Sequence, residues 1–150
     1  MQFTTIPLGN AYLHFHEGLA DLFQGRMTAA EAAYRQGLRV AEEYFGAESH
    51  PKALGNVLLA EILYQKDEIE AACVHLHDGL PGLEAHDAFV DAYATGYQTG
   101  IAHARARQDA DAALKLLARG EEFAISRNLS RLGTVINGLR LQTQIGRAHV

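Results

Sequence analysis

Three stretches of the sequence can be aligned with one another, and the repeat that they form limits the folds open to this chain. They run from Gly18 to Leu38, from Ala60 to Leu80 and from Ile101 to Glu121. The coinciding positions carry a small residue, a bulky residue and a glycine in turn: Ala30, Ala72 and Ala113; Tyr34, Leu76 and Leu117; Gly37, Gly79 and Gly120. A self-similarity of about 40 residues is typical of stacked helix pairs.

A helix pair of this kind cannot cover its own apolar face. It packs that face against the next pair, so a chain of pairs grows into an array with an extended concave surface. The repeat therefore predicts an all-α fold of antiparallel helix pairs, with the function sought in recognition along the inner surface. The alanines and bulky residues of the second helices are expected to form the core.

Apolar spacing, together with turn and capping residues, predicts about seven helices. A capping box of Thr28 and Glu31 is expected to start the second helix, and Pro51 to lie in the first turn of the third. Pro81 is expected to end the fourth helix, and Gly146 to form a turn after the seventh. The expected ranges are 10–24, 28–44, 51–65, 67–79, 86–107, 109–126 and 131–144.

The length of 150 residues and a hydrophobic content of 48% are sufficient for one buried core. We therefore expect a single helical-repeat domain over residues 1–150, with repeats at 10–45, 50–81 and 86–126 and a half repeat at 130–146. Because the half repeat leaves a flank of the last helix uncovered, we interpret the chain as a fragment of a longer array. Either end could pair with another copy.

The charge pattern argues against binding of nucleic acid by this segment. The net charge is −5, and the Lys and Arg residues are scattered rather than gathered into a basic stripe. The apolar runs are too short to cross a bilayer, and the N-terminal residues lack the pattern of a signal peptide. Cys73 is the single cysteine, which excludes an internal disulfide. These features predict a cytoplasmic location.

The pattern of the first repeat resembles a tetratricopeptide repeat. The residues that carry this likeness are Gly18, Ala20, Gly25, Ala30, Tyr34 and Leu38. The Trp of that consensus is absent, and the period is longer than the usual one of about 34 residues. The resemblance implies a right-handed superhelix in which the first helix of each pair lines the inner surface.

Longer phrases resemble the helical-repeat region of MalT-like regulators of the LuxR class, and this likeness extends over nearly the whole chain. One family phrase is matched by Ala60, Glu61, Leu63, Tyr64, Asp67 and Ala71 or Ala72, and a later one by Leu129, Arg131, Leu132, Arg140, Leu141 and Gly146. The sequence departs from the family at Gln65, where Glu is favoured, and at Gly138, where Glu commonly precedes the Arg.

This resemblance implies an effector-sensing and protein-interaction segment, placed between an ATP-binding switch domain and a helix-turn-helix domain that binds DNA. The chain itself has no Gly-rich phosphate loop followed by Lys-Ser or Lys-Thr. An inducer or a partner protein on the concave face would shift the population of conformations and permit self-association. The alternative is a general adaptor that holds an extended peptide.

If the first helices line the inner surface, the residues that project there follow from the register. They are Tyr12, Phe15, Leu19, Leu54, Val57, Glu61, Tyr64, Thr95, Gln98, Ala102, Arg105, Ile136, Arg140 and Thr143. The nine candidates for ligand or peptide binding are Tyr12, Phe15, Leu19, Val57, Glu61, Tyr64, Gln98, Arg105 and Arg140. Aromatic rings with a few directional polar groups suit a small polar ligand or a peptide. A purely structural alternative is that Glu61 pairs with Arg105 or Arg140 between repeats.

Neither a metal site nor catalysis is expected. Cys73 and His77 have the spacing of two ligands on one helical face, but nothing in the sequence nominates a third ligand. No nucleophile has a companion base, and Ser49 with His50 is interpreted as a helix entry. We therefore expect a binding protein that uses no cofactor.

Overall fold

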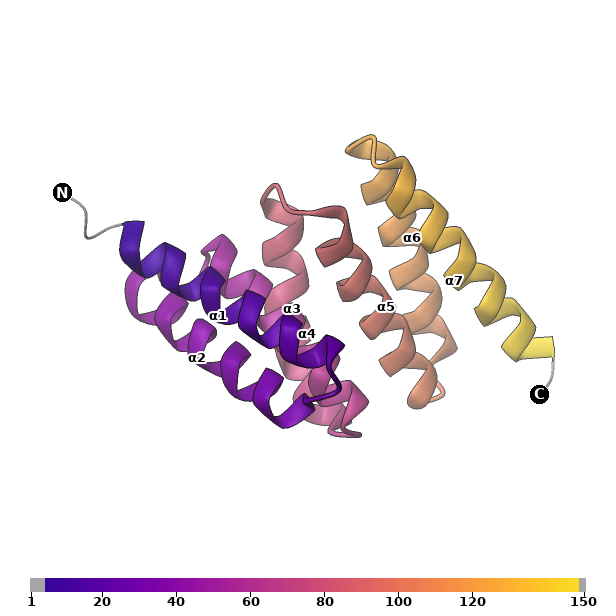
Figure 1. Ribbon diagram of the computed structural model, residues 1–150. Helices are drawn as coiled ribbons and strands as arrows, with labels where there is room; N and C mark the ends of the chain where they lie inside the picture. The colour runs from indigo at the N-terminus through magenta and orange to yellow at the C-terminus, as the bar shows by residue number, and fades with distance from the viewer. Residues whose placement is uncertain (1–4, 149–150) are drawn as a thin grey trace. The chain divides into compact units, whose positions relative to one another are not determined.

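The computed structural model describes residues 5–148, and within that range it contains seven α-helices and no strand (Figure 1). The helices are α1 (Thr5–Phe23), α2 (Met27–Phe45), α3 (His50–Gln65), α4 (Ile69–Ala85), α5 (Val90–Ala106), α6 (Ala110–Ser126) and α7 (Ser130–Ala148). The all-α fold and its number of helices are thus as the sequence predicts. Residues 1–4 and 149–150 of the expected domain lie outside the described range.

The helices belong to two compact units, Met1–Asp87 and Ala88–Val150. The first unit contains two helix pairs, α1 with α2 and α3 with α4, and α3 also packs against α1 and α2. In the second unit, α5 pairs with α6 and α7 packs against both. The single domain over residues 1–150 and its single continuous superhelix stay predictions.

Four of the connections between helices share one turn geometry. In each, one residue has a positive φ, and the amide of the next residue donates to a carbonyl five positions earlier. The positive-φ residues are Gly25, Asp67, Gln108 and Asn128, and the donor–acceptor pairs are Arg26–Asp21, Glu68–Leu63, Asp109–Ala104 and Leu129–Ala124, at 2.8 to 2.9 Å. These bonds satisfy helix-end carbonyls, as in the Schellman motif. Of the four residues, only Gly25 is a glycine, the residue that adopts a positive φ without strain.

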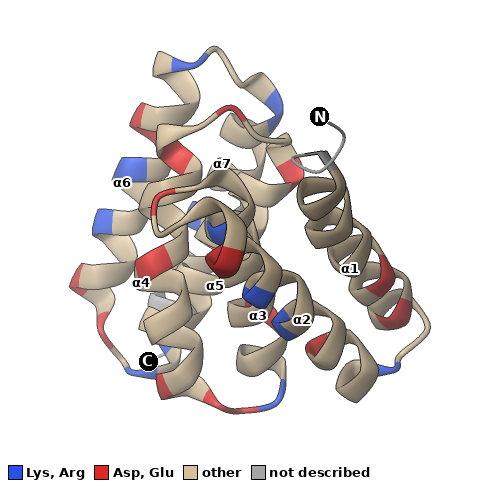
Figure 2. Cartoon of the chain, turned by 90° about the vertical axis from the view of Figure 1, so that its left-hand side faces the viewer, with Lys and Arg blue, Asp and Glu red and all other residues tan. Residues whose placement is uncertain are grey.

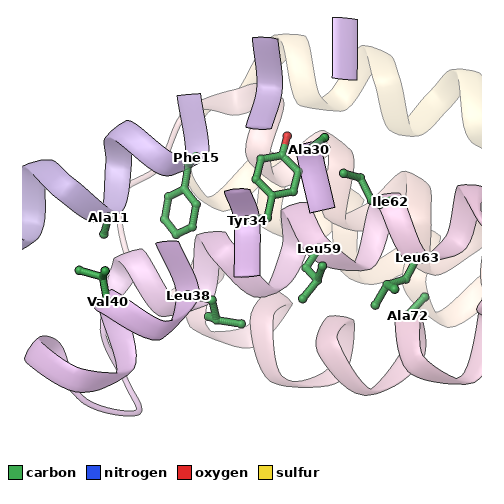
Figure 3. Packing of buried hydrophobic residues seen from close by; sticks show 10 residues of the cluster. All are labelled: Ala11, Phe15, Ala30, Tyr34, Leu38, Val40, Leu59, Ile62, Leu63 and Ala72. Atoms are coloured by element: carbon green, nitrogen blue, oxygen red, sulfur yellow. The ribbon is translucent and has the colours of Figure 1, made fainter. Parts of the chain in front are cut away.

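Close approach of the helices explains two of the glycines in the first unit. A Cβ atom at Gly18 on α1 would lie 2.4 Å from the ring of Tyr34, which crosses from α2 toward α1 (Figure 3). A Cβ atom at Gly37 on α2 would lie 2.5 Å from the ring of Phe15 and 3.0 Å from the carbonyl oxygen of Ala11. The missing side chains therefore let α1 and α2 approach closely enough for these rings to fill the core.

The glycine repeat recurs in the other pairs. A Cβ atom at Gly79 on α4 would lie 2.9 Å from Asn56 and 3.0 Å from the carbonyl oxygen of Ala53, both on α3. At Gly120 on α6, the nearest atoms would be side-chain carbons of Ile136, at 2.6 Å, and Tyr97, at 3.2 Å. Buried positions of the second helices also include the predicted core residues: Ala30, Tyr34 and Leu38; Ala72, Leu76 and Leu80; Ala113 and Leu117.

Three predicted helix signals are wrong. Thr28 lies inside α2, whose N-cap residue Arg26 makes no side-chain capping bond; Glu31 instead accepts hydrogen bonds from Arg35 at 2.9 Å and from Lys66 at 2.5 Å. Pro81 lies within α4, which continues to Ala85. The proline is exposed and removes only one backbone hydrogen bond, and the packing of the opposite side of the helix outweighs that loss. Gly146 is helical, since α7 continues to Ala148.

Two predicted helix starts are confirmed. Ser49 is the N-cap of α3, where its hydroxyl accepts from the amide of Lys52 at 3.4 Å and Pro51 occupies the first turn. Asp109 caps α6 by accepting from the amide of Ala112 at 2.9 Å. Both satisfy amides that have no partner within the helix.

Candidate functional site

Two of the predicted binding residues belong to the core. Phe15 is 3% exposed and packs against the positions of Gly37 and Gly55, while Val57 is fully buried. Neither side chain is accessible to a ligand, which corrects the expectation that they line the inner surface. Their position follows from packing: α3 lies against both α1 and α2, so the middle of each first helix is covered by its neighbours.

The exposed part of α1 and α3 forms the candidate site, which we call the α1/α3 face. Tyr12, Leu22, Leu54 and Leu58 are half-buried apolar residues that pack against the core cluster, and Leu19 lies seven residues after Tyr12, on the same stripe of α1. Glu61 follows Leu58 by three residues on α3 and is partly buried. Tyr64 is also half-buried against the core cluster. The face therefore offers an apolar floor with a carboxyl group.

A chain of polar contacts fixes one end of this face. The hydroxyl of Tyr12 lies 2.5 Å from Nδ1 of His50, at the start of α3. The ring of His50 packs edge-on against His86 at a centroid distance of 5.9 Å, and Nε2 of His86 lies 3.0 Å from the carbonyl oxygen of Glu48. Burial, followed by the charge of His86, lowers the pKa of His50. The contacts hold α1, the entry to α3 and the end of α4 together.

Two polar groups of the first unit lack the partners that their burial calls for. Tyr34 is fully buried, and its hydroxyl has no hydrogen-bond partner within the described residues. Glu61 makes no hydrogen bond or ion pair within residues 5–148, and burial raises the pKa of its carboxyl. Burial and then the charge of Glu61 raise the pKa of Tyr34. The two groups thus share an environment to which the described residues bring no cation.

The remaining predicted residues belong to the second unit. Gln98 and Arg105 are exposed on α5, and the guanidinium of Arg105 lies 3.5 Å from the position that a Cβ atom of Gly146 would take on α7. Arg140 on α7 donates to Glu121 on α6 at 2.6 Å. The structure therefore gathers Tyr12, Leu19, Glu61 and Tyr64 in one unit and the other three in the second. One face running through both stays a prediction.

Sequence reasoning missed the roles of His50 and of the Tyr34 hydroxyl. The sequence predicts Tyr34 as a core residue, which is confirmed, but the equivalent positions hold Leu76 and Leu117, which have no polar atom to place. The tyrosine at a position where the other repeats have leucine was the one feature of the sequence that indicated a buried hydroxyl here. For His50, the contact with Tyr12 depends on how α3 lies against α1, and no sequence pattern reports that angle.

The charged residues do not form a basic surface. In Figure 2, Lys and Arg are interspersed with Asp and Glu along the helices.

A hollow of about 640 Å³ lies between the turn before α3 and the end of α4, with Lys52 on one side and Asp78 on the other. Within the described residues, no three His, Cys, Asp or Glu side chains are grouped closely enough to bind a metal ion. None of the helices described in residues 5–148 has the length and apolar character needed to cross a membrane.

Comparisons with known proteins give one kind of relative. The proteins described as "Serine/threonine-protein kinase PknK" in Mycobacterium tuberculosis and Mycobacterium bovis are 30% identical to the chain over 139 residues. The match covers 93% of this chain but only 12% of the relatives' length. No family model matches the sequence. No solved structure matches it either. The chain is therefore similar to one short segment of a much longer protein.

Proposed function

We propose that this chain is the partner-binding segment of a larger regulatory protein and that the α1/α3 face receives the partner. The observation that carries the proposal is the row of half-buried apolar side chains, Tyr12, Leu22, Leu54 and Leu58, which continues on α1 with the exposed Leu19. Apolar positions of this kind beside a few polar groups suit recognition better than solvation. In this proposal the segment is cytoplasmic and has no catalytic role.

In its more specific form, the proposal is that the segment senses an effector in a MalT-like regulator of the LuxR class. The phrases around Glu61 and Arg140 support this assignment. The similarity to a small part of a long protein kinase supports the more general idea that segments of this type occur within longer regulatory proteins. An inducer on the face would favour one conformation over another and so change how the flanking domains associate.

The second candidate is an adaptor that binds an extended peptide. The observation that favours it is the length of the apolar row, which runs along α1 from Tyr12 to Leu22 and along α3 from Leu54 to Leu58. A peptide that lies along two helices can place alternate side chains on such a row, whereas a small metabolite would occupy only part of it.

The two candidates differ in their ligands. We would screen the chain by thermal shift against a metabolite library and, in parallel, against a display library of peptides. One metabolite hit supports the sensor, and peptide hits support the adaptor. For any hit, Leu19→Ser should weaken binding while Val74→Ser, a change at an exposed apolar residue on α4, should not. Equal affinity of the two variants for every hit would contradict a site on the α1/α3 face.

A further inference from the structure

The hollow beside the start of α3 is a part of the first unit that the α1/α3 face does not include. One wall is formed by the loop before α3 and the first two turns of that helix, and the other by the last turns of α4. Its volume of about 640 Å³ is in the range of small-molecule sites. None of the residues that define the α1/α3 face is among those that line the hollow.

The floor of the hollow is apolar and carries no bulky side chain. Ala53 contributes to it from α3, and Pro81, Gly82 and Ala85 contribute from α4. A Cβ atom at Gly82 would lie 2.7 Å from the Cβ atom of Ala53, so the two helices approach closely here. Because the lining side chains are small, an apolar group of a ligand can lie against this floor.

Asn56 brings a hydrogen-bond donor to the hollow. The residue is 4% exposed, and its Oδ1 lies 2.7 Å from Nδ1 of His75 on α4. Its NH2 group makes no hydrogen bond within the described residues, yet it is not sealed from solvent as the hydroxyl of Tyr34 is. Since Asn56 lines the hollow, we place the accessible NH2 group there, where it can donate to a ligand.

Lys52 adds a positive charge on the same wall. It precedes Asn56 by four residues, which places both side chains on one side of α3. The Nζ atom of Lys52 lies 3.6 Å from a carboxylate oxygen of Glu42, which is longer than a hydrogen bond. An ammonium group and an amide NH2 group one turn apart match the two oxygens of a carboxylate. The α3 wall therefore fits the carboxylate of a ligand.

Asp78 brings an acceptor to the opposite wall. It directly precedes Gly79, where a Cβ atom would lie 2.9 Å from the Cβ atom of Asn56, so it lies near the same level of the hollow. Its carboxylate is 3.6 Å from the exposed ring of His77, a contact that contributes little. Glu48 also lines the hollow, so the site has two carboxylates for one ammonium group, which disfavours a phosphate.

We propose that this hollow binds a free amino acid with an apolar side chain. The carboxylate of the amino acid accepts hydrogen bonds from the Lys52 ammonium and the Asn56 NH2 group, and its ammonium group donates to Asp78. The apolar side chain lies on the floor at Ala53 and Gly82. The inference goes beyond the proposed function, because it requires no partner on the α1/α3 face.

The test uses L-alanine, L-valine and L-leucine, each compared with its N-acetyl derivative and with its amide. The N-acetyl derivative lacks the positive charge, and the amide lacks the carboxylate. Binding to the whole chain would be followed by chemical-shift titration of ¹⁵N-labelled protein. We expect at least one free amino acid to bind about tenfold more tightly than either derivative, because each derivative loses a charge-assisted hydrogen bond. If none of the three binds, or if none is preferred over both of its derivatives, the proposal is overturned.

Two variants assign the two ends of the ligand. Lys52→Met keeps the apolar stem of the side chain and should remove the preference over the amide, while the preference over the N-acetyl derivative remains. Asp78→Asn should have the reverse effect. Glu43→Gln, an exposed change on α2, is the control and should leave both preferences intact. Variants at Lys52 and Asp78 that weaken all three ligands equally, or that retain both preferences, would contradict these roles.

Two further variants test the donor and the location. Asn56→Asp retains an acceptor for His75 but replaces the NH2 group, so binding should weaken about tenfold in protein whose circular dichroism is unchanged. Unchanged affinity would overturn the donor. Leu19→Ser, on the α1/α3 face, should leave amino-acid binding as it is in the wild type. A loss of binding in this variant would move the ligand to that face and overturn the hollow as its site.

Discussion

The glycines at equivalent repeat positions of the two units pack against different kinds of atoms. Gly37 in the first unit lies opposite backbone and an aromatic ring, because its Cβ position is 3.0 Å from the carbonyl oxygen of Ala11 and 2.5 Å from Phe15. At Gly120 in the second unit, the three nearest atoms would be side-chain carbons: two of Ile136, at 2.6 and 3.2 Å, and one of the Tyr97 ring, at 3.2 Å. Glycines at equivalent repeat positions therefore answer different packing constraints, because backbone atoms cannot move aside for an added Cβ atom whereas the end of a flexible side chain can.

The polar groups of the two units differ in the same way. In the first unit, contacts among Tyr12, His50 and His86 join α1, the start of α3 and the end of α4, and the hydroxyl of the fully buried Tyr34 has no hydrogen-bond partner within the described residues. At the position equivalent to Tyr34, the second unit has the apolar Leu117. At this repeat position the first unit thus buries a polar atom where the second unit buries none, which departs from the local rule that a core position is apolar.

The largest expected effect is the loss of folding stability when the glycines at these two positions are replaced by alanine. Gly37→Ala should destabilise the fold by about 2 to 4 kcal/mol, because neither α1 backbone nor the buried ring of Phe15 can move aside. Gly120→Ala should cost less than Gly37→Ala, because the nearest atom is the end of the Ile136 side chain rather than backbone, and because alanine favours a helix over glycine by about 1 kcal/mol. Urea denaturation followed by circular dichroism measures both, with amide exchange reporting which unit is loosened. Equal losses in the two variants would remove the distinction between backbone and side-chain contact.

A smaller effect is expected from the pH dependence of the first unit. Burial lowers the pKa of His50 in the folded state, so the unfolded chain binds the proton more readily. The stability that this group contributes is complete above its ordinary pKa of about 6.5, and it is lost as the pH falls below that value and through the lowered pKa of the folded state. Because His50 is only partly buried, the loss should be about 1 kcal/mol or less.

Urea denaturation at several pH values between 8 and 5 would measure this loss. His50→Gln should flatten the pH dependence, though a part should remain because burial also lowers the pKa of His75. His16→Gln, an exposed change on α1, is the control. A wild-type curve that His50→Gln leaves unchanged would show that the Tyr12–His50 contact does not link folding to protonation.

The smallest expected effect concerns the turns. Gln108 and Asn128 both have a positive φ, at 57° and 56°, in the second unit, where the first unit has Gly25 at its first turn. Gln108→Gly should stabilise the fold by about 0.5 to 1 kcal/mol, because a side chain with a Cβ atom is strained there. Asn128→Gly should gain less, since asparagine tolerates this conformation better. Thermal denaturation of the two variants measures the order, and a larger gain at Asn128 would contradict it.

Much of the fold follows from the sequence, because helix pairs are determined by local signals. Apolar spacing and the repeat predict all seven helices, and the helix starts predicted at Ser49 and Asp109 are confirmed. The errors lie where tertiary packing overrides a local signal: α4 continues past Pro81, and α7 continues past Gly146.

Less of the candidate site follows from the sequence. The register alone assigns Phe15 and Glu61 to the same surface, but the angle between α1 and α3 buries the first and leaves the second partly exposed. Ridge-and-groove packing decides that angle through the shapes of both helices, which periodicity does not encode. The Tyr12–His50 contact depends on the same angle, so it too was beyond sequence reasoning.

The proline within α4 has a mechanical consequence for the end of the first unit. Pro81 cannot donate the hydrogen bond that the carbonyl of His77 would accept, so the turn from Gly82 to Ala85 is tied to the rest of α4 by fewer bonds. That turn leads directly to His86, which bonds to Glu48. If this turn unfolds locally, the hydrogen bond from His86 to the loop before α3 is lost with it. Pro81 therefore favours local opening where the end of α4 meets the start of α3.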